Sequence, residues 1–406
     1  MSTPVAITKG KDSYLIDENN NAYIDAISSW WVNIHGHSNE YIAQKIYEQA
    51  LQLEHIIFAG FTHEPAVKLA ERLLKILPGN FFKIFYSDDG STSTEVAIKM
   101  SIQYWWNVQS MVNGKQPTER RIKLLAFKNS YHGDTFGAMS VSNRSVFTLA
   151  FHDILPDVIF IDTPDENNIS SIKEEIAKHE NSIAAFIYEP LVQGAGGIKM
   201  YDATLLDELL YFIQQKNIIC IADEVMTGFG RTGKMFASEY MQTKPDIICL
   251  SKGITGGVMA LGVTACSEKI YNAYITDDAR KTFFHGHSFT ANPLACTAAN
   301  ANLDLFEKNN VLGQIENIGV QNRAFAAQLK ELNGIKNVRM LGTILAFEIT
   351  QGDDVYLNNI SQVVTAKALE KGVYIRPLGN TVYIMPPYCI TNEELEKVYA
   401  VLTEIL

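Results

Sequence analysis

Long apolar segments are absent from this 406-residue sequence, and cysteine is scarce. No run of roughly 18 or more residues is apolar, which argues against a membrane-spanning helix, and the first residues lack the apolar core of a secretory signal. The five cysteines stand singly without a CxxC pair, so we expect neither a disulfide framework nor a metal site. Cys220 and Cys249 lie inside apolar runs, which predicts buried thiols in a cytoplasmic protein.

Positive charge is also in short supply. The chain carries 34 basic against 45 acidic residues, a net charge of -11, and such a surface repels nucleic-acid phosphates and anionic lipid. We therefore expect neither nucleic acid nor a membrane as a partner, while a local pocket for a small anion stays open. The composition of 47% hydrophobic and 19% charged residues is typical of a globular enzyme that buries a large core.

Six segments show the spacing of apolar residues that is typical of helices. They are Glu40–Leu53, Pro65–Leu77, Thr92–Trp106, Ala203–Gln215, Pro293–Glu307 and Asn392–Leu406. Short continuous apolar runs lie between several of them and suit strands that are covered on both faces. These runs are Lys83–Tyr86, Lys123–Phe127, Val158–Ile161, Ile183–Tyr188, Ile218–Ala222, Ile247–Leu250 and Leu261–Cys266.

The order of these segments predicts an α/β fold with a mostly parallel central sheet flanked by helices. After Lys308 the pattern changes to a long polar helix and then to two strand-like pieces between Val338 and Thr350, broken at Gly342. Helix, strand and helix follow, which predicts a smaller C-terminal α+β domain. We expect an N-terminal segment at 1–39 that packs with the small domain, a large domain at 40–307 and the small domain at 308–406.

The carboxyl ends of the predicted strands are where an open α/β sheet binds ligands. The segment that follows the first strand opens a helix, so the Gly90 and Ser91 amides can face a phosphate. The capping pattern of Thr92 and Glu95 also fits a helix that is merely well capped. Tyr131, in the turn after the second strand, can stack on a flat heterocycle or can belong to an ordinary loop.

Asp223 and Lys252 carry the most specific signal. Asp223 leaves a strongly apolar strand, where an unpaired carboxylate costs several kcal/mol, so it needs a cationic partner. That partner can be the protonated nitrogen of a pyridine ring, or Arg231 or another base in a structural pair. Lys252 stands just past the next apolar strand, where desolvation lowers the pKa of an amine and suits it to imine formation. The alternative is a solvated surface lysine.

Taken together, these segments resemble the class III, fold type I aminotransferases, which use pyridoxal 5'-phosphate, and the resemblance covers nearly the whole chain. It rests mainly on Asp223–Gly233 (DEVMTGFGRTG) and Ser251–Gly253 (SKG). The resemblance implies that Lys252 binds the cofactor covalently and that Asp223 pairs with its ring nitrogen, with Tyr131 as a third catalytic residue. It also implies a homodimer, in which the Ser288 hydroxyl reaches the phosphate of the neighbouring subunit's cofactor, with His287 beside it as a further cofactor-binding residue. The further cofactor contacts that it implies are Gly90, Ser91, Tyr131 and Val225.

Within that class, the sequence is most similar to the adenosylmethionine-8-amino-7-oxononanoate aminotransferase family. The similarity rests on Ser28–Trp31, Tyr131–Ser140, Val192–Gly197, Ile375–Pro377 and Met385–Tyr388. It implies that 8-amino-7-oxononanoate is the amino acceptor and S-adenosylmethionine the donor. Paired indoles suit a long aliphatic chain and an arginine suits a carboxylate, although core aromatics and a surface arginine are the alternatives. The substrate contacts implied are Trp30, Trp31, Tyr131, Gly286 and Arg376.

Three other functions fit parts of this pattern. The first is another class III transaminase, acting on ornithine, 4-aminobutyrate or an ω-amino acid, and the tandem tryptophans argue against it. The second is an aminomutase, which moves an amino group within one substrate and releases no keto acid. The third is a non-catalytic binding protein on the same scaffold. The presence of both Lys252 and Asp223 argues against the third.

Overall fold

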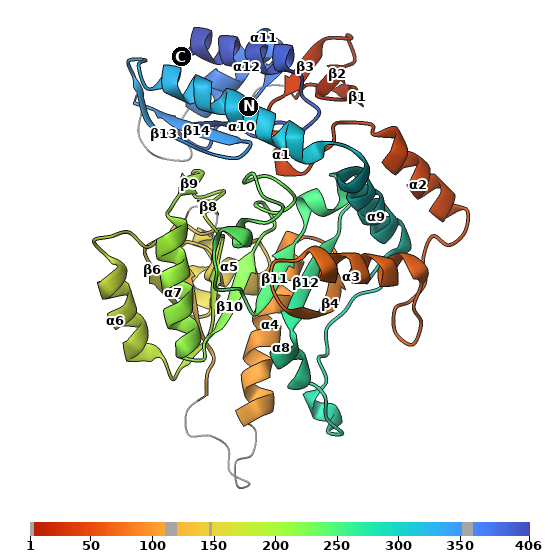
Figure 1. Ribbon diagram of the computed structural model, residues 1–406, viewed down its shortest axis with the longest axis vertical. Coiled ribbons are helices and arrows are strands. Elements are labelled where there is room, and N and C mark those ends of the chain that lie inside the picture. Colours follow the sequence, from red (N-terminus) through yellow and green to blue (C-terminus); the bar gives the residue numbers. More distant parts are fainter. Residues whose placement is uncertain (1–3, 110–119, 146–147, 351–359) are drawn as a thin grey trace.

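The computed structural model describes residues 4–109, 120–145, 148–350 and 360–406, and a seven-stranded sheet forms its centre (Figure 1). The strand order is β4-β12-β11-β10-β7-β5-β6, and β12 alone in this sheet runs antiparallel to its neighbours. The predicted α/β fold with a mostly parallel sheet is confirmed. The strands are β4 (Phe81–Ser87), β5 (Lys123–Phe127), β6 (Val158–Ile161), β7 (Ile183–Tyr188), β10 (Ile219–Asp223), β11 (Ile247–Leu250) and β12 (Gly262–Ser267).

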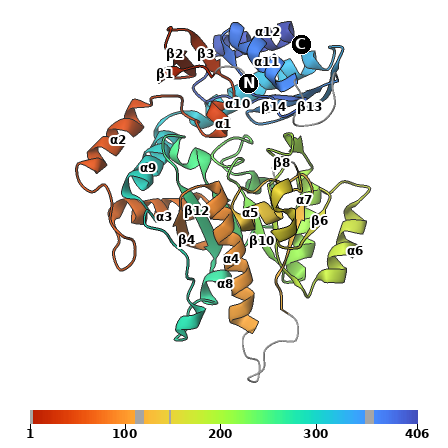
Figure 2. The same ribbon diagram turned by 180° about the vertical axis from the view of Figure 1, so that it is seen from behind.

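Both faces of this sheet are covered by helices. Ile221 of β10 belongs to a buried cluster with α4 (Gly90–Gln109), whereas its neighbour Ala222 belongs to a second cluster with α7 (Ala203–Gln215). Figure 1 and Figure 2 show these two helices from opposite sides of the molecule. Because the central strands β7, β10 and β11 are buried throughout, they need no polar alternation, and this is why they appear in the sequence as continuous apolar runs.

A smaller part of the chain lies above the sheet and contains both ends of the chain (Figure 1). One small sheet has the order β1-β2-β3-β15, so N-terminal strands pair with a C-terminal one, and another has the order β13-β14-β16. The predicted break at Gly342 is confirmed, because β13 and β14 form a hairpin around it. The domain bounds given above stay a prediction. The elements are β1 (Ile7–Lys11), β2 (Tyr14–Asp17), β3 (Ala22–Asp25), α10 (Val311–Leu329), β13 (Ile335–Leu341), β14 (Ile344–Ile349), α11 (Ile360–Glu370), β15 (Val373–Tyr374), β16 (Thr381–Ile384) and α12 (Asn392–Ile405).

The six predicted helices are all present, and their ends follow from capping chemistry. Asn292 caps α9 through the amides of Leu294 and Ala295, and Thr391 forms a reciprocal capping box with Glu394 at α12. Cys220 and Cys249 are buried free thiols, as predicted. In the described part of the chain, no helix is long and apolar enough to cross a membrane. The remaining helices and strands are α1 (Ser28–Trp31), α2 (Glu40–Ala50), α3 (Glu64–Ile76), α5 (Phe136–Val141), α6 (Ile169–His179), α8 (Glu268–Asn272), α9 (Pro293–Lys308), β8 (Val192–Gln193) and β9 (Lys199–Met200).

Candidate active site

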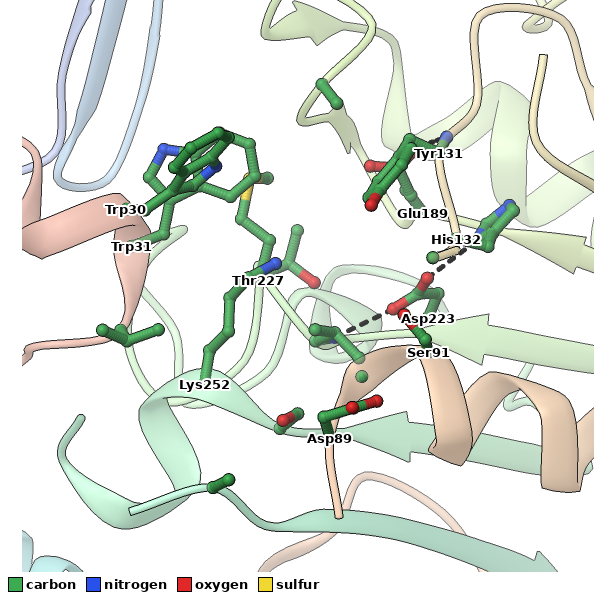
Figure 3. Close-up of a pocket in the computed structure, with 18 of the residues that line it drawn as sticks. Trp30, Trp31, Asp89, Ser91, Tyr131, His132, Glu189, Asp223, Thr227 and Lys252 are labelled. Atoms are coloured by element: carbon green, nitrogen blue, oxygen red, sulfur yellow. Dashed lines mark hydrogen bonds and ion pairs between the residues drawn. The ribbon is translucent and has the colours of Figure 1, made fainter. Parts of the chain in front are cut away.

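The loops that follow five strands of the large sheet meet at its carboxyl edge and enclose a cavity of about 630 Å³. Figure 3 shows Trp30 and Trp31 on one side of this cavity and Tyr131 on the other, with the Lys252 amine directed into the space between them. The fold therefore brings together residues that are up to 348 positions apart, Trp30 and Leu378 (378 minus 30). The predicted site residues that line the cavity are Trp30, Trp31, Gly90, Ser91, Tyr131, Asp223, Val225 and Lys252.

Lys252 stands directly after Ser251 at the end of β11, with a left-handed backbone (φ +46°). Its amine lies 4.9 Å from the centre of the Trp31 ring, and no described carboxylate forms an ion pair with it. Burial lowers the pKa of Lys252, and the carboxylates of Asp223 and Glu189 partly oppose that shift. The amine therefore belongs to the cavity rather than to the surface, and a larger fraction of it is the neutral nucleophile.

Asp223 ends β10 with its carboxylate almost fully buried. One oxygen accepts the Val225 amide at 3.0 Å, and the other accepts a hydrogen bond from His132 Nδ1 at 2.7 Å. Of the alternative, a structural pair with Arg231 or another base, the part that names Arg231 is wrong, because that guanidinium donates instead to backbone carbonyls such as that of Pro386, whereas His132 is a base that does pair with Asp223. Each oxygen of the Asp223 carboxylate thus has one protein partner, and the residue lines the cavity where a ligand can meet it.

The N-terminus of α4 lies at the floor of the cavity, beside Val225. A Cβ atom added at Gly90 would lie 2.7 Å from a methyl of Val225, so glycine lets the helix end pack against that side chain. Gly133 makes a similar approach to Ser91, since a Cβ atom there would lie 2.3 Å from the Ser91 hydroxyl. The first amides of a 20-residue helix face the cavity in this way, a favourable setting for an anion.

The predicted capping pair of Thr92 with Glu95 at the start of α4 is wrong. Thr92 pairs with Asp89 rather than with Glu95: the Thr92 amide donates to Asp89 Oδ1 at 2.8 Å, and the Asp89 amide donates to the Thr92 hydroxyl at 2.9 Å. Glu95 lies one turn later and accepts the Thr135 hydroxyl at 2.6 Å and the Gly137 amide at 2.8 Å. Its carboxylate thereby fixes the loop that carries Tyr131.

Tyr131 is held from both ends. Its amide donates to Glu189 Oε1 at 3.0 Å, and its hydroxyl donates to Asp134 Oδ2 at 2.8 Å. The second oxygen of Glu189 accepts the Gly194 amide at 2.7 Å. Burial, mainly, and the hydrogen bond to Asp134 raise the pKa of Tyr131, so its hydroxyl stays protonated. The ring is therefore a fixed neutral wall of the cavity.

Trp30 and Trp31 form the opposite wall, on the short segment labelled α1. Trp31 is buried, and its indole N–H donates to the Tyr383 hydroxyl at 3.0 Å, whereas Trp30 is 43% exposed. Both residues have a left-handed backbone, which costs an L-residue about 1–2 kcal/mol. The guanidinium of Arg376, which is itself exposed, lies 4.2 Å from the centre of the Trp30 ring. The reading of these tryptophans as core aromatics fits Trp31 in part and Trp30 not at all.

Four predicted site residues do not line the cavity of their own chain: Gly286, His287, Ser288 and Arg376. Gly286 and Ser288 are exposed, and His287 Nε2 lies 3.3 Å from Asp88 Oδ1, at the loop that leads into α4. For Ser288 the prediction concerns the site of a second copy, so its role stays a prediction, as do those of His287 and the other site residues.

Comparison with known proteins agrees with this geometry. The family model for the class-III aminotransferases matches residues 1–406. The chain belongs to the class-III aminotransferases. An adenosylmethionine-8-amino-7-oxononanoate aminotransferase of Synechococcus elongatus is 42% identical to this aminotransferase over 416 residues, covering 99% of this chain and 95% of the relative. The crystal structure of the enzyme of that name from Methanocaldococcus jannaschii is 36% identical, with a TM-score of 0.92, and the match covers 100% of this chain and 93% of that one.

A third similar structure bears on the cofactor. An amine transaminase from an uncultivated Pseudomonas species, solved in its PLP-bound form, has a TM-score of 0.91 and 28% identity, covering 99% of this chain and 94% of that one. The cavity of the present aminotransferase fits such a group. It offers a buried amine, a carboxylate, a helix N-terminus and, at Gly90, a glycine that lets this helix end pack closely against Val225.

Two residues of this aminotransferase that lie at the site were missed in the sequence. His132 bonds Asp223, and Glu189 bonds the Tyr131 loop, and both line the cavity. Glu189 directly follows β7, so the rule that ligands collect at strand ends could have found it. His132 sits beside Tyr131 in a turn whose sequence also fits an ordinary loop. Its partner Asp223 is 91 positions away, so no local sequence pattern points to the pair.

Replacing Glu189 with glutamine should change how the stability of this aminotransferase depends on pH. Burial raises the pKa of Glu189 from its ordinary 4.5 to about 7, so the folded chain retains a proton that the unfolded chain has released. This stabilisation is complete below pH 4.5 and is lost as the pH rises through about 7. The free energy of unfolding of the wild type should therefore fall relative to that of Glu189→Gln across this range. Urea unfolding at several pH values measures it, and parallel curves would contradict the assignment.

Proposed function

We propose that this aminotransferase transfers an amino group to 8-amino-7-oxononanoate, giving 7,8-diaminononanoate in biotin biosynthesis, with pyridoxal 5'-phosphate as cofactor and S-adenosylmethionine as donor. The observation that carries the proposal is the buried Lys252 amine, with the Asp223 carboxylate in the same cavity and two indoles beside the amine. The proposed substrates are those that appear in the enzyme names of the relatives from Synechococcus elongatus and Methanocaldococcus jannaschii.

The residues of the cavity suggest how the cofactor is held. The amides of Gly90 and Ser91 at the start of α4 would bind the phosphate, and Tyr131 and Val225 would cover the two faces of the ring. A remaining lone pair of the Asp223 carboxylate, whose two oxygens each already accept one hydrogen bond from the protein, would bind the ring nitrogen and keep it protonated. When bound, pyridoxal phosphate supplies an aldehyde and a cationic ring that withdraws electrons.

Lys252 has two tasks in this proposal. Its amine is the nucleophile that condenses with an aldehyde, which requires the neutral form that burial favours. Once released from the aldehyde carbon, the same nitrogen would remove the proton from the substrate carbon that bears the amino group and deliver it to the former aldehyde carbon, as a general base and a general acid in turn. His132 holds the Asp223 carboxylate in place through both tasks, because its Nδ1 occupies the oxygen that the Val225 amide does not.

The substrate side of the cavity is apolar with one nearby cation. Trp30 and Trp31 present indole faces to an aliphatic chain, and Arg376 stacks on the outer indole, at the mouth of the cavity. No described carboxylate forms an ion pair with Arg376, so its guanidinium is available to a carboxylate at the far end of a chain.

Replacing Arg376 with alanine should raise the KM for 8-amino-7-oxononanoate about tenfold and leave kcat nearly unchanged. The physical reason is the loss of a planar, two-pronged grip on the carboxylate, a contact made equally in the ground and transition states. Steady-state kinetics measure it, and Arg376→Lys is the matched control, which keeps the charge without the planar fork. An unchanged KM in Arg376→Ala would remove the assigned grip.

One assay tests the proposed reaction as a whole. Purified enzyme is incubated with 8-amino-7-oxononanoate and either S-adenosylmethionine or lysine, and the diamine is sought by mass spectrometry. Formation of 7,8-diaminononanoate with one of the donors is the expected result. Turnover of ornithine or 4-aminobutyrate in its place would favour another class III transaminase. Product without a released keto acid would favour an aminomutase.

We further propose a homodimer with active sites at the interface, working in the cytoplasm. The segment at 286–288 does not line the cavity of its own chain and is flanked by Phe284 and Phe289, which are 74% and 58% exposed. A second copy would bury these rings and receive Ser288 near its phosphate site. Free buried thiols suit a reducing compartment. Light scattering of the purified protein should give twice the chain mass of 45.3 kDa.

A further inference from the structure

Residues 28–31 form one left-handed turn, although none of them is glycine. Their φ angles are +52°, +45°, +68° and +75° in sequence order, and the Trp31 amide closes the turn by donating to the Ile27 carbonyl at 2.9 Å. The Cβ atom of an L-residue crowds its own carbonyl in this conformation, so such a backbone persists only where its surroundings hold it.

The first group that holds the turn is the fully buried carboxylate of Asp25, at the end of β3. It accepts the Ser29 hydroxyl at 2.7 Å and the Ile27 amide at 3.3 Å, and it lies 3.0 Å from His37 Nε2. The other ring nitrogen of His37, Nδ1, lies 3.1 Å from the side-chain Nδ2 of Asn33, just after the turn. These bonds tie the turn to the strand before it and the segment after it.

Residues that are far away in the sequence also form hydrogen bonds with the turn at residues 28–31. The Ser28 hydroxyl donates to the Met385 carbonyl at 2.7 Å, and the Arg231 guanidinium donates to the Trp31 carbonyl at 3.1 Å. Arg231 is itself fully buried, and its acceptors are backbone carbonyls. The indole N–H of Trp31 donates to the Tyr383 hydroxyl. The turn is therefore set by three separate parts of the fold.

We propose that Asp25 and Ser29 are positioning residues which, by keeping residues 28–31 left-handed, place both indoles beside Lys252 and so determine the preference for a long acceptor chain. Neither residue lines the cavity, so they act through Trp30 and Trp31. The inference rests on the proposed function, because that function assigns the two indoles to the acceptor chain.

The first experiment needs no substrate. Glycine adopts a left-handed backbone at no steric cost, whereas alanine keeps that cost and lacks the hydroxyl. Thermal unfolding of Ser29→Gly should therefore occur at a higher temperature than that of Ser29→Ala, by about 2 °C or more. Ser171 is the matched control, because its hydroxyl also donates one hydrogen bond, to the Asn168 carbonyl, but it lies in the right-handed helix α6, where alanine should be the more stable. If the glycine and alanine variants had the same order of unfolding temperatures at position 29 as at position 171, the proposal would be overturned.

The second experiment measures specificity. The kcat/KM for 8-amino-7-oxononanoate is divided by that for 3-aminobutan-2-one, which keeps the amino ketone and lacks the carboxyalkyl chain. In Ser29→Ala and Asp25→Asn this ratio should fall about tenfold through the KM of the long acceptor, with the visible absorbance of bound cofactor unchanged. Ser29→Gly should restore most of the ratio. Equal losses on both acceptors would show a merely structural role and overturn the proposal.

Failure of the proposed function and failure of the positioning role give different experimental results. If the wild type does not convert 8-amino-7-oxononanoate, the proposed function fails, while the order of Ser29→Gly and Ser29→Ala in thermal unfolding still decides what holds the turn. If the wild type converts it and the ratio is unaffected in both Ser29→Ala and Asp25→Asn, the function stands and the positioning role is wrong.

Discussion

Replacing Lys252 with alanine should lower turnover about 10⁴-fold or more and remove the visible absorbance of the lysine-bound cofactor. The amine is the one group placed both to condense with an aldehyde and to carry the substrate proton, so its loss removes a nucleophile and a general base together. No neighbouring described amine lines the cavity to replace it. Absorbance spectra and single-turnover rates with the amino donor measure the two losses separately.

The control for this variant is Lys308→Ala. Lys308 also holds its amine over an aromatic ring, 4.6 Å from the centre of Tyr41, but on the surface and away from the cavity. It should retain normal spectra and rates. Wild-type activity in Lys252→Ala would end the assignment, and an added small primary amine that recovers part of the rate would support the proton-transfer task.

Replacing Asp223 with asparagine should lower kcat about 100-fold or more and weaken retention of the cofactor. A neutral amide cannot stabilise a positive ring nitrogen, and groups of this kind that stabilise developing charge are worth about 10²–10³ in rate. The amide would also disturb the short bond with His132. Rates at saturating cofactor and cofactor content after dialysis measure the two effects.

Asp246→Asn is the matched control, since Asp246 lies in the same sheet at the opposite end of the strands. Its carboxylate accepts the Cys220 amide at 3.0 Å and pairs with Lys269, so the change perturbs a comparable hydrogen-bonded group. A loss of rate confined to Asp223→Asn supports a role at the cofactor. Equal losses in both variants would show that only the stability of the sheet had changed.

Strand and helix positions were predictable because they depend on local patterns. The runs at Ile247–Leu250 and Ile183–Tyr188 are strands with those bounds, since a strand covered on both faces needs only apolar residues. The capping partners at α4 were not predictable in the same way. Thr92 has suitable residues on both sides, and the choice of Asp89 frees Glu95 to bind the loop at Thr135, a contact between two separate elements.

The sequence alone determined the fold class and the residues at the strand ends, Lys252 and Asp223 among them, because apolar periodicity and strand-end chemistry are properties of neighbouring residues. Tertiary structure alone decided that His132 is the partner of Asp223, that Glu189 holds the Tyr131 loop, and that the tryptophans stand on a left-handed turn. One bond of that turn joins residues 357 positions apart. Such contacts arise only when separate elements pack against one another, so no local pattern in the sequence contains them.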